Sequence, residues 1–296
     1  MNKFLFIFLS FALLINGYGQ NNSFPKDPQE AKFITRDIKN FWTAFDAVEY
    51  SKNNPFENYI RNGSPGLRGF IPNRIINADS LLSMVQRRKQ DYKKMRGIEK
   101  LIKEKEKLIK PYFYALEYWY PYAVYPPVYF VIGRYNSGGT STENGLIIGA
   151  EKLTGLDHLP ELVIHESIHF QQKWPEGGNT NLLQQSVLEG SADFIAELVT
   201  GIKGNLKANN YGNKNKDELC KEFVKRMYKD DLQDWLYGTS GKDKRPNDLG
   251  YWIGYEIVKA YFDKMEDKKL AVNRILNIDD YKRFLKESGY LEKYMK

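Results

Sequence analysis

The residues best suited to chemistry in this chain are His165, Glu166 and His169, within the stretch His-Glu-Ser-Ile-His. They include two of the three histidines in the whole sequence. On a helix, positions 165 and 169 lie one turn apart and point the same way. Two imidazoles placed in this way can bind one Zn²⁺, while Glu166 stands beside them as a base for water. The spacing is the H-E-x-x-H pattern typical of zinc-dependent hydrolases.

The residues around this motif predict a helix with a buried side. Pro160 suits the first turn of a helix, and the apolar residues that follow are Leu162, Val163, Ile164 and Ile168. A histidine pair inside a protein needs polar partners, and a metal ion supplies them. The alternative is a histidine pair that only caps a helix or packs.

A second predicted helix, over residues 182–200, carries two further candidates, Glu189 and Asp193, one turn apart. A catalytic zinc site uses three protein ligands and keeps one position open, so Glu189 is the predicted third ligand. Asp193 is predicted to accept a hydrogen bond from the second nitrogen of a ligand histidine. The small residues 190–192 would let the two helices pack closely. The alternative is a surface helix with ordinary acidic residues.

The two elements together resemble the gluzincin metallopeptidases, the thermolysin-like clan. The longer sequence is similar to a largely uncharacterised family of bacterial zinc-dependent proteases related to gliding-motility lipoprotein B. The matching segments, which cover most of the chain after residue 19, are Phe41–Asp46, Gly63–Leu67, Asn144–Gly149, His165–Gln171, Glu189–Phe194 and Asp248–Tyr255. The resemblance implies an α+β, mostly helical, zincin-like fold with a small sheet or hairpin beside the zinc helix. It also implies a zinc metallopeptidase.

Two short strands are predicted at residues 128–134 and 145–149, joined as a hairpin. In gluzincins, the strand before the zinc helix forms the edge of the sheet beside the cleft, where an extended peptide can pair with it. Residues 145–149 come in the right order for that role. The alternative is an ordinary hairpin in the core.

A late predicted helix, residues 248–262, places Gly250 and Gly254 on one face and Tyr251 and Tyr255 on another. Close packing through the glycines would bring the tyrosines near the metal. Tyr251, ahead of Tyr255, is therefore the predicted donor to the oxyanion of the transition state. The alternative is that both tyrosines only pack in the core.

The chain begins like a secretory signal peptide, with a short basic start, an apolar run at Phe4–Ile15 and small residues at 17 and 19. The run is too short to span a bilayer. We therefore expect cleavage after residue 19 and a periplasmic or secreted protein without a transmembrane segment. Residues 20–296 should form one zincin-like domain, with a helical part over about 28–110 and a catalytic part over about 111–296.

The net charge of +7 is concentrated in residues 87–110, where acidic residues are interleaved and apolar residues recur at helical spacing. This pattern predicts a helix with a solvated basic face and not a nucleic-acid site, and no nucleic-acid motif is present. The single cysteine, Cys220, excludes an intramolecular disulfide and is predicted to be buried.

These observations predict a zinc metallopeptidase that cleaves peptides or proteins, with Glu166 taking the proton of the attacking water and passing it to the leaving amine. Two alternatives remain open. One is a non-catalytic envelope or gliding-related protein that keeps the fold, and the other is a zinc amidase acting on a non-peptide substrate. The charge and shape of the cleft would separate them. The sequence does not indicate an oligomeric state.

Overall fold

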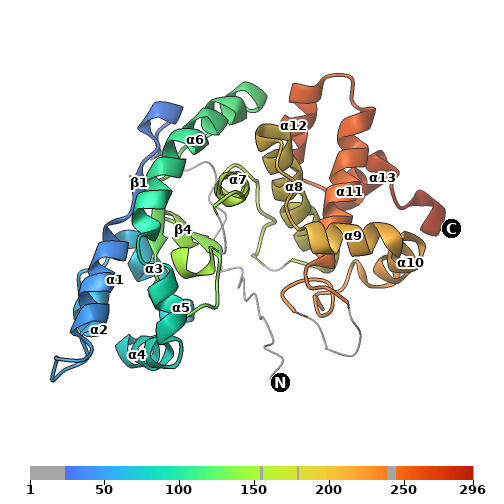
Figure 1. Ribbon diagram of the computed structural model, residues 1–296. Coiled ribbons are helices and arrows are strands. Elements are labelled where there is room, and N and C mark those ends of the chain that lie inside the picture. Colours follow the sequence, from blue (N-terminus) through green and yellow to red (C-terminus); the bar gives the residue numbers. More distant parts are fainter. Residues whose placement is uncertain (1–23, 154–155, 179, 239–244, 296) are drawn as a thin grey trace.

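The computed structural model describes residues 24–153, 156–178, 180–238 and 245–295. The expected signal peptide, residues 1–19, lies outside the described residues. The described chain is mostly helical and contains one four-stranded sheet (Figure 1), in agreement with the predicted α+β class. Residue 110, where we expected the helical part to end, lies inside the long helix α6 (Ile98–Trp119).

The first part of the chain is helical, and its helices at Arg36–Ala47 and Pro65–Phe70 contact the sheet (Figure 1). The core of this part is aromatic, because the Phe41 ring lies 5.4–5.6 Å from those of Phe56, Tyr59 and Tyr92. The elements are η1 (Pro28–Glu30), α1 (Arg36–Ala47), α2 (Phe56–Arg61), α3 (Pro65–Phe70), the π-helix η2 (Ile71–Ile75), α4 (Ala78–Arg87), α5 (Lys89–Lys94) and α6 (Ile98–Trp119).

The sheet has the strand order β1-β2-β4-β3. Its strands are β1 (Phe33–Ile34), β2 (Val128–Val131), β3 (Gly139–Thr142) and β4 (Gly145–Gly149). The predicted hairpin between the second and fourth of these is wrong: β2 and β4 run parallel, with Val128 opposite Leu146. The hairpin partner of β4 is β3, which lies in the stretch we had expected to be a loop. Gly145, with φ of 136°, reverses the chain between them.

The edge role predicted for residues 145–149 is also wrong, because β4 lies between β2 and β3. Every residue of β4 is buried, as expected of a strand with neighbours on both sides. The edge strand next to β4 is β3, whose residues are all partly exposed.

The second part of the chain is helical. Its elements are η3 (Ala150–Lys152), α7 (Leu159–His169), α8 (Leu182–Thr200), α9 (Leu206–Lys214), α10 (Lys216–Arg226), α11 (Leu249–Lys264), α12 (Lys268–Leu276), α13 (Tyr281–Ser288) and η4 (Glu292–Tyr294). Figure 1 shows α7 between the sheet on one side and α8 on the other.

Helices α8 and α11 pack with almost no space between their backbones. A Cβ added to Gly254 would lie 1.7 Å from the Ser186 carbonyl oxygen, and one added to Gly190 would lie 2.1 Å from the Gly254 carbonyl carbon. Only glycine permits these approaches. The expected close docking of the Gly250 and Gly254 face is confirmed, since a Cβ at Gly250 would also meet Leu236 at 2.6 Å.

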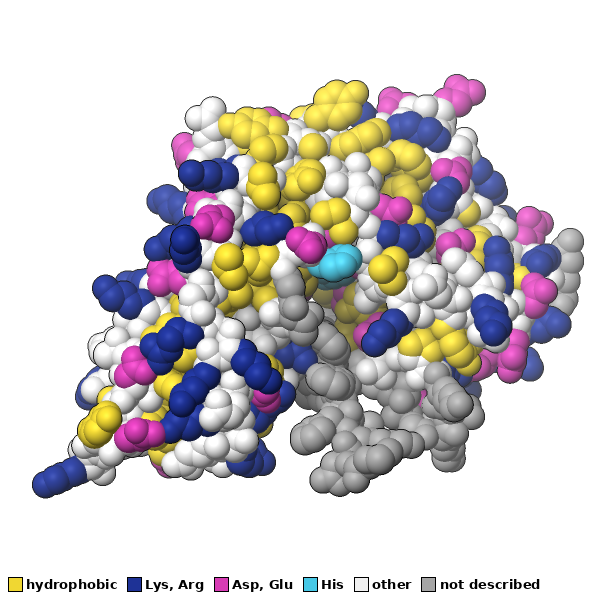
Figure 2. All heavy atoms as spheres, viewed as in Figure 1, with side chains coloured by type: hydrophobic (Ala, Val, Ile, Leu, Met, Phe, Trp, Pro, Cys, Tyr) yellow, Lys and Arg dark blue, Asp and Glu magenta, His cyan; other side chains and the backbone are white. Residues whose placement is uncertain are grey.

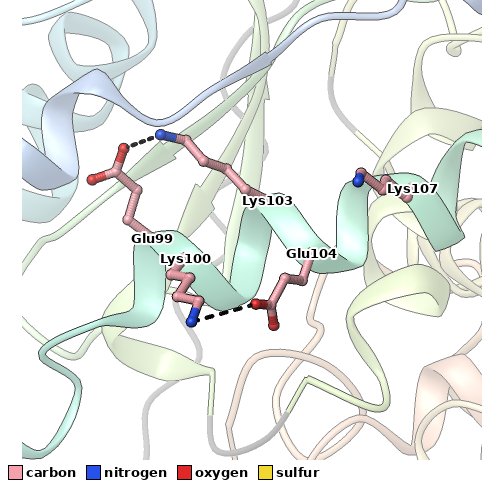
Figure 3. A pocket seen from close by; sticks show the side chains of 5 residues that line it. All are labelled: Glu99, Lys100, Lys103, Glu104 and Lys107. Carbon is pink, nitrogen blue, oxygen red and sulfur yellow. Dashed lines mark hydrogen bonds and ion pairs between the residues drawn. The ribbon is translucent and has the colours of Figure 1, made fainter.

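The basic residues lie mainly on solvated surface, as predicted. On α6, Lys103 pairs with Glu99 and Lys100 with Glu104 along the exposed face (Figure 3), while Ile102 is buried beneath. Figure 2 shows basic and acidic side chains interspersed over the visible face of the protein. Within the described residues, no helix combines the length and apolarity needed to cross a membrane. Cys220 is buried, and burial raises the pKa of its thiol to about 11.

Candidate metal centre

Two neighbouring helices, α7 and α8, carry the predicted site. Helix α8 begins at Asn181, whose side chain accepts from the Gln184 backbone while Gln184 accepts in return, and it ends at Gly201 with φ of 72°. Nearly all of α8 is buried between its neighbours. Acidic side chains on such a helix are removed from water, so they need partners inside the protein.

The structure brings His165, His169 and Glu189 together. Atom Oε2 of Glu189 lies 3.5 Å from Nε2 of His165 and 3.3 Å from Nε2 of His169. One ligand atom from each residue lies within 4.8 Å of the other two. The side chains are only 6–10% exposed. Two ring nitrogens and a carboxylate oxygen therefore converge on one buried point.

Asp193 fixes the orientation of His165. Its Oδ1 atom lies 2.8 Å from Nδ1 of His165, within hydrogen-bond distance. Its second oxygen accepts from the Asn205 side chain at 2.7 Å. A carboxylate can only accept here, so Nδ1 of His165 carries the hydrogen and Nε2 presents a lone pair toward Glu189.

Gln172 fixes the orientation of His169 in the same way, and the sequence did not predict Gln172 as a site residue. Its amide nitrogen donates to the Leu188 carbonyl at 2.7 Å and to Ser191 at 2.8 Å. Because a backbone carbonyl can only accept, the amide oxygen of Gln172 must be the atom that faces Nδ1 of His169, at 2.7 Å. Nδ1 of His169 is therefore the donor, and Nε2 of His169 carries the lone pair that faces Glu189. The only sequence signal was a glutamine three residues after the motif.

This donor set fits Zn²⁺. Two imidazole nitrogens and one carboxylate oxygen, all of them hydrogen-bond acceptors, face one another with no donor between them. Such a cluster is stable only if a cation binds there or if protons are added. Burial favours neutral groups, yet the carboxylates of Asp193 and Glu189 outweigh it and raise the pKa of His165 well above its usual value. Burial likewise acts against ionised Glu189, but His169 and His165 hold its pKa well below normal. The site thus favours positive charge where the three residues meet.

Glu166 faces the edge strand of the sheet. A Cβ added to Gly139 of β3 would lie 2.4 Å from Oε1 of Glu166, so the absence of a side chain at Gly139 makes room for this carboxylate. Burial raises the pKa of Glu166, while the charges of His165, His169 and Arg74 act to lower it.

Arg74 is a second residue that the sequence reasoning missed. It lies on the π-helix η2 and is 2% exposed. Its side chain donates to Ser137 at 3.3 Å and to Thr140 at 2.9 Å, on either side of Gly139. Arg74 therefore stabilises the part of β3 that contacts Glu166. No local sequence pattern around residue 74 predicts this role.

The two candidate tyrosines of α11 have different surroundings. The Tyr251 ring is stacked on that of His165, with 6.0 Å between centroids and 17° between planes. Tyr255 packs on Phe194 at 5.6 Å and lies under the Lys203 ammonium at 4.5 Å. Of the pair, Tyr251 is the one that stacks on a candidate metal ligand, His165, and its role as a donor stays a prediction.

Buried nitrogen and oxygen donors with an acidic residue alongside are the arrangement that metal-dependent hydrolases use. The family described as "Predicted Zn-dependent protease (DUF2268)" matches residues 131–282, which is half of the chain and includes His165, Glu166, His169 and Glu189. The chain belongs to this family. No curated protein and no solved structure matches it. The expected relation to gliding-motility lipoprotein B stays a prediction.

Proposed function

We propose that this protein is a gluzincin-type zinc metallopeptidase with a zincin-like fold that acts on peptides or proteins in the periplasm or outside the cell. His165, His169 and Glu189 would hold one Zn²⁺. One observation carries the proposal: Nε2 of both histidines and one oxygen of Glu189 meet at a buried point, while Nδ1 of each histidine is already committed to another partner. This is the ligand set of a catalytic zinc site with an open position.

The edge of the sheet supports a peptide as the substrate. Among the described residues, strand β3 pairs with a strand on one side only, and it contacts α7 beside Glu166. An extended chain can pair with such an edge through backbone hydrogen bonds. A peptide bound along β3 would lie next to the proposed base. This preference for an extended backbone favours a peptidase over an amidase of non-peptide bonds.

In the proposed reaction, bound zinc would supply Lewis acidity, which polarises the scissile carbonyl and activates water. Glu166 accepts the proton of the attacking water and then donates it to the leaving amine. Burial raises the pKa of Glu166, and the charges of His165, His169 and Arg74 act against this rise. Asp193 and Gln172 hold the imidazoles in place. Tyr251 donates a hydrogen bond to the oxyanion.

The test compares the zinc-loaded wild type with Glu166→Gln on a mixed peptide library, with cleavage products identified by mass spectrometry. We expect Glu166→Gln to keep its zinc and to lose activity by at least about 100-fold, as expected for removal of a general base. Glu176→Gln, which changes an exposed glutamate between the two helices, is the matched control and should cleave like the wild type.

Absence of peptide cleavage by the zinc-loaded wild type would count against a peptidase. If zinc-loaded wild type cleaves and Glu166→Gln cleaves equally well, the base lies elsewhere.

A further inference from the structure

The two carboxylate oxygens of Glu189 have different surroundings. Oε2 faces the two histidines. Oε1 accepts a hydrogen bond from the Tyr237 hydroxyl at 2.8 Å and one from the Gln185 amide at 3.1 Å. The sequence reasoning identified neither of these partners.

The hydrogen bonds around Oε1 form a complete set. The Gln185 amide nitrogen has two hydrogens, one for Glu189 and one for the Tyr237 oxygen at 2.8 Å. The Tyr237 hydroxyl is then left to donate to Glu189. The Gln185 oxygen accepts from Thr180 at 2.7 Å. Each donor therefore has one acceptor, and the arrangement leaves little freedom for the carboxylate to turn.

The backbone of Tyr237 has an energetically unfavourable conformation. Its φ is 62°, a left-handed value that is unfavourable for a bulky residue, and Gly238 follows with φ of 146°. Two contacts with the start of α11 fix this turn. The Asp248 carboxylate accepts from the Tyr237 backbone, and the Gly250 backbone donates to the Trp235 carbonyl at 2.7 Å. A strained tyrosine aimed at a buried carboxylate indicates a positioning role.

The geometry points to Tyr237 and Gln185 as positioning residues that make Glu189 offer one oxygen, Oε2, to the metal. Binding through both oxygens would require Oε1 to give up two hydrogen bonds in a buried site, which is unfavourable. Ligation through one oxygen leaves coordination positions for water and substrate. This inference rests on the proposed function, because it takes Glu189 as a metal ligand.

The test measures zinc affinity of the full chain by competition with a chelator. Tyr237→Phe removes one hydroxyl and should weaken zinc binding by about 10-fold, the lower end of the range for residues that orient metal ligands. Tyr125→Phe is the matched control, because Tyr125 is buried and its hydroxyl, like that of Tyr237, donates one hydrogen bond, here to the Phe113 carbonyl at 3.1 Å. The control should bind zinc like the wild type.

A second measurement asks whether the effect acts through Glu189. With Co²⁺ in place of zinc, the visible absorption spectrum reports the number and type of ligands. It should change in Tyr237→Phe, where Glu189 is free to bind through both oxygens, and not in Tyr125→Phe. In a Glu189→Ala background, Tyr237→Phe should have no further effect on zinc affinity.

The outcomes separate this inference from the proposed function. If the wild type binds no zinc, both are overturned. If it binds zinc through Glu189 but Tyr237→Phe matches the control in affinity and spectrum, only the positioning role is overturned. A loss that persists in the Glu189→Ala background, or a fall in kcat at unchanged zinc affinity, would also overturn it, because Tyr237 would then act on something other than Glu189.

Discussion

Two buried glutamates show how differently two regions of this protein treat the same side chain. Glu151, after strand β4, and Glu189, on helix α8, are each only 5% exposed. Burial raises the pKa of Glu151 to about 7. The same burial acts on Glu189, but His169 and His165 outweigh it and hold that pKa well below its usual value. Burial therefore does not decide the charge of a carboxylate here; its neighbours do.

The surroundings explain the contrast. Glu151 lies among Gly133, Gly149 and the Phe70 ring, and it accepts from the Tyr135 backbone at 3.3 Å. Burial there outweighs the backbone hydrogen bonds that Glu151 accepts, which favour the ionised form, so the pKa is raised. The helices around Glu189 instead provide two imidazoles. The groups that stabilise a buried negative charge thus lie at α7 and α8, which is where we expect a cation to bind.

The largest expected difference between Glu151 and Glu189 is in zinc binding, and neutralising each glutamate in turn tests it. Glu189→Gln should weaken zinc binding by more than about 100-fold, because loss of a ligand should exceed the 10- to 100-fold cost of losing an orienting partner. Glu151→Gln should leave zinc affinity unchanged. Competition with a chelator measures both, and an equal loss in the two variants would contradict the contrast.

The next largest effect concerns the donor beside His165. Tyr251→Phe should lower kcat by about 100- to 1,000-fold and leave KM nearly unchanged, since the hydrogen bond forms only as charge develops in the transition state. Tyr255→Phe, on the same helix but against Phe194, is the control and should retain activity. If both variants keep the wild-type kcat, the two tyrosines are packing residues.

Glu151 makes a prediction about pH and stability. In the unfolded chain the carboxyl group of Glu151 has its usual pKa of 4.5, whereas in the folded protein its pKa is about 7. The stabilisation is complete below pH 4.5 and is lost as the pH rises to about 7, by up to roughly 3 kcal/mol. Urea unfolding of Glu151→Gln at several pH values should show a smaller decline in stability than the wild type. Identical pH dependence would show that Glu151 does not titrate in this way.

A smaller effect is expected from the partner of His165. Asp193→Asn should weaken zinc affinity by about 10- to 100-fold without unfolding the protein. Circular dichroism and a chelator titration test the two parts of this expectation. Unchanged affinity together with unchanged activity would remove Asp193 from the site.

Much of the site was predictable because its signals are local. His165, Glu166 and His169 fall within one helical turn, and Glu189 stands out as an acid among small and apolar residues. The glycine pair at 250 and 254 also predicted close helix packing, which the structure confirms.

The partners that hold these groups were not predictable in the same way. Tyr237 reaches Glu189 from 48 residues away, through a left-handed turn that no local pattern indicates. Arg74 reaches Thr140 of β3 from 66 residues earlier in the chain. Strands β2 and β4 do pair, but the predicted hairpin orientation was wrong, because the polar stretch that forms β3, the true hairpin partner of β4, resembles a loop in sequence.

The most direct test of the central claim is the zinc content of three purified proteins: the wild type, His169→Ala and His158→Ala. His158 precedes α7, is exposed and is the one histidine outside the site, so it controls for loss of a histidine. We predict one zinc per chain in the wild type and in His158→Ala, and little or none in His169→Ala. Equal zinc in all three proteins, or none in the wild type, would contradict the claim that His165, His169 and Glu189 form a zinc site.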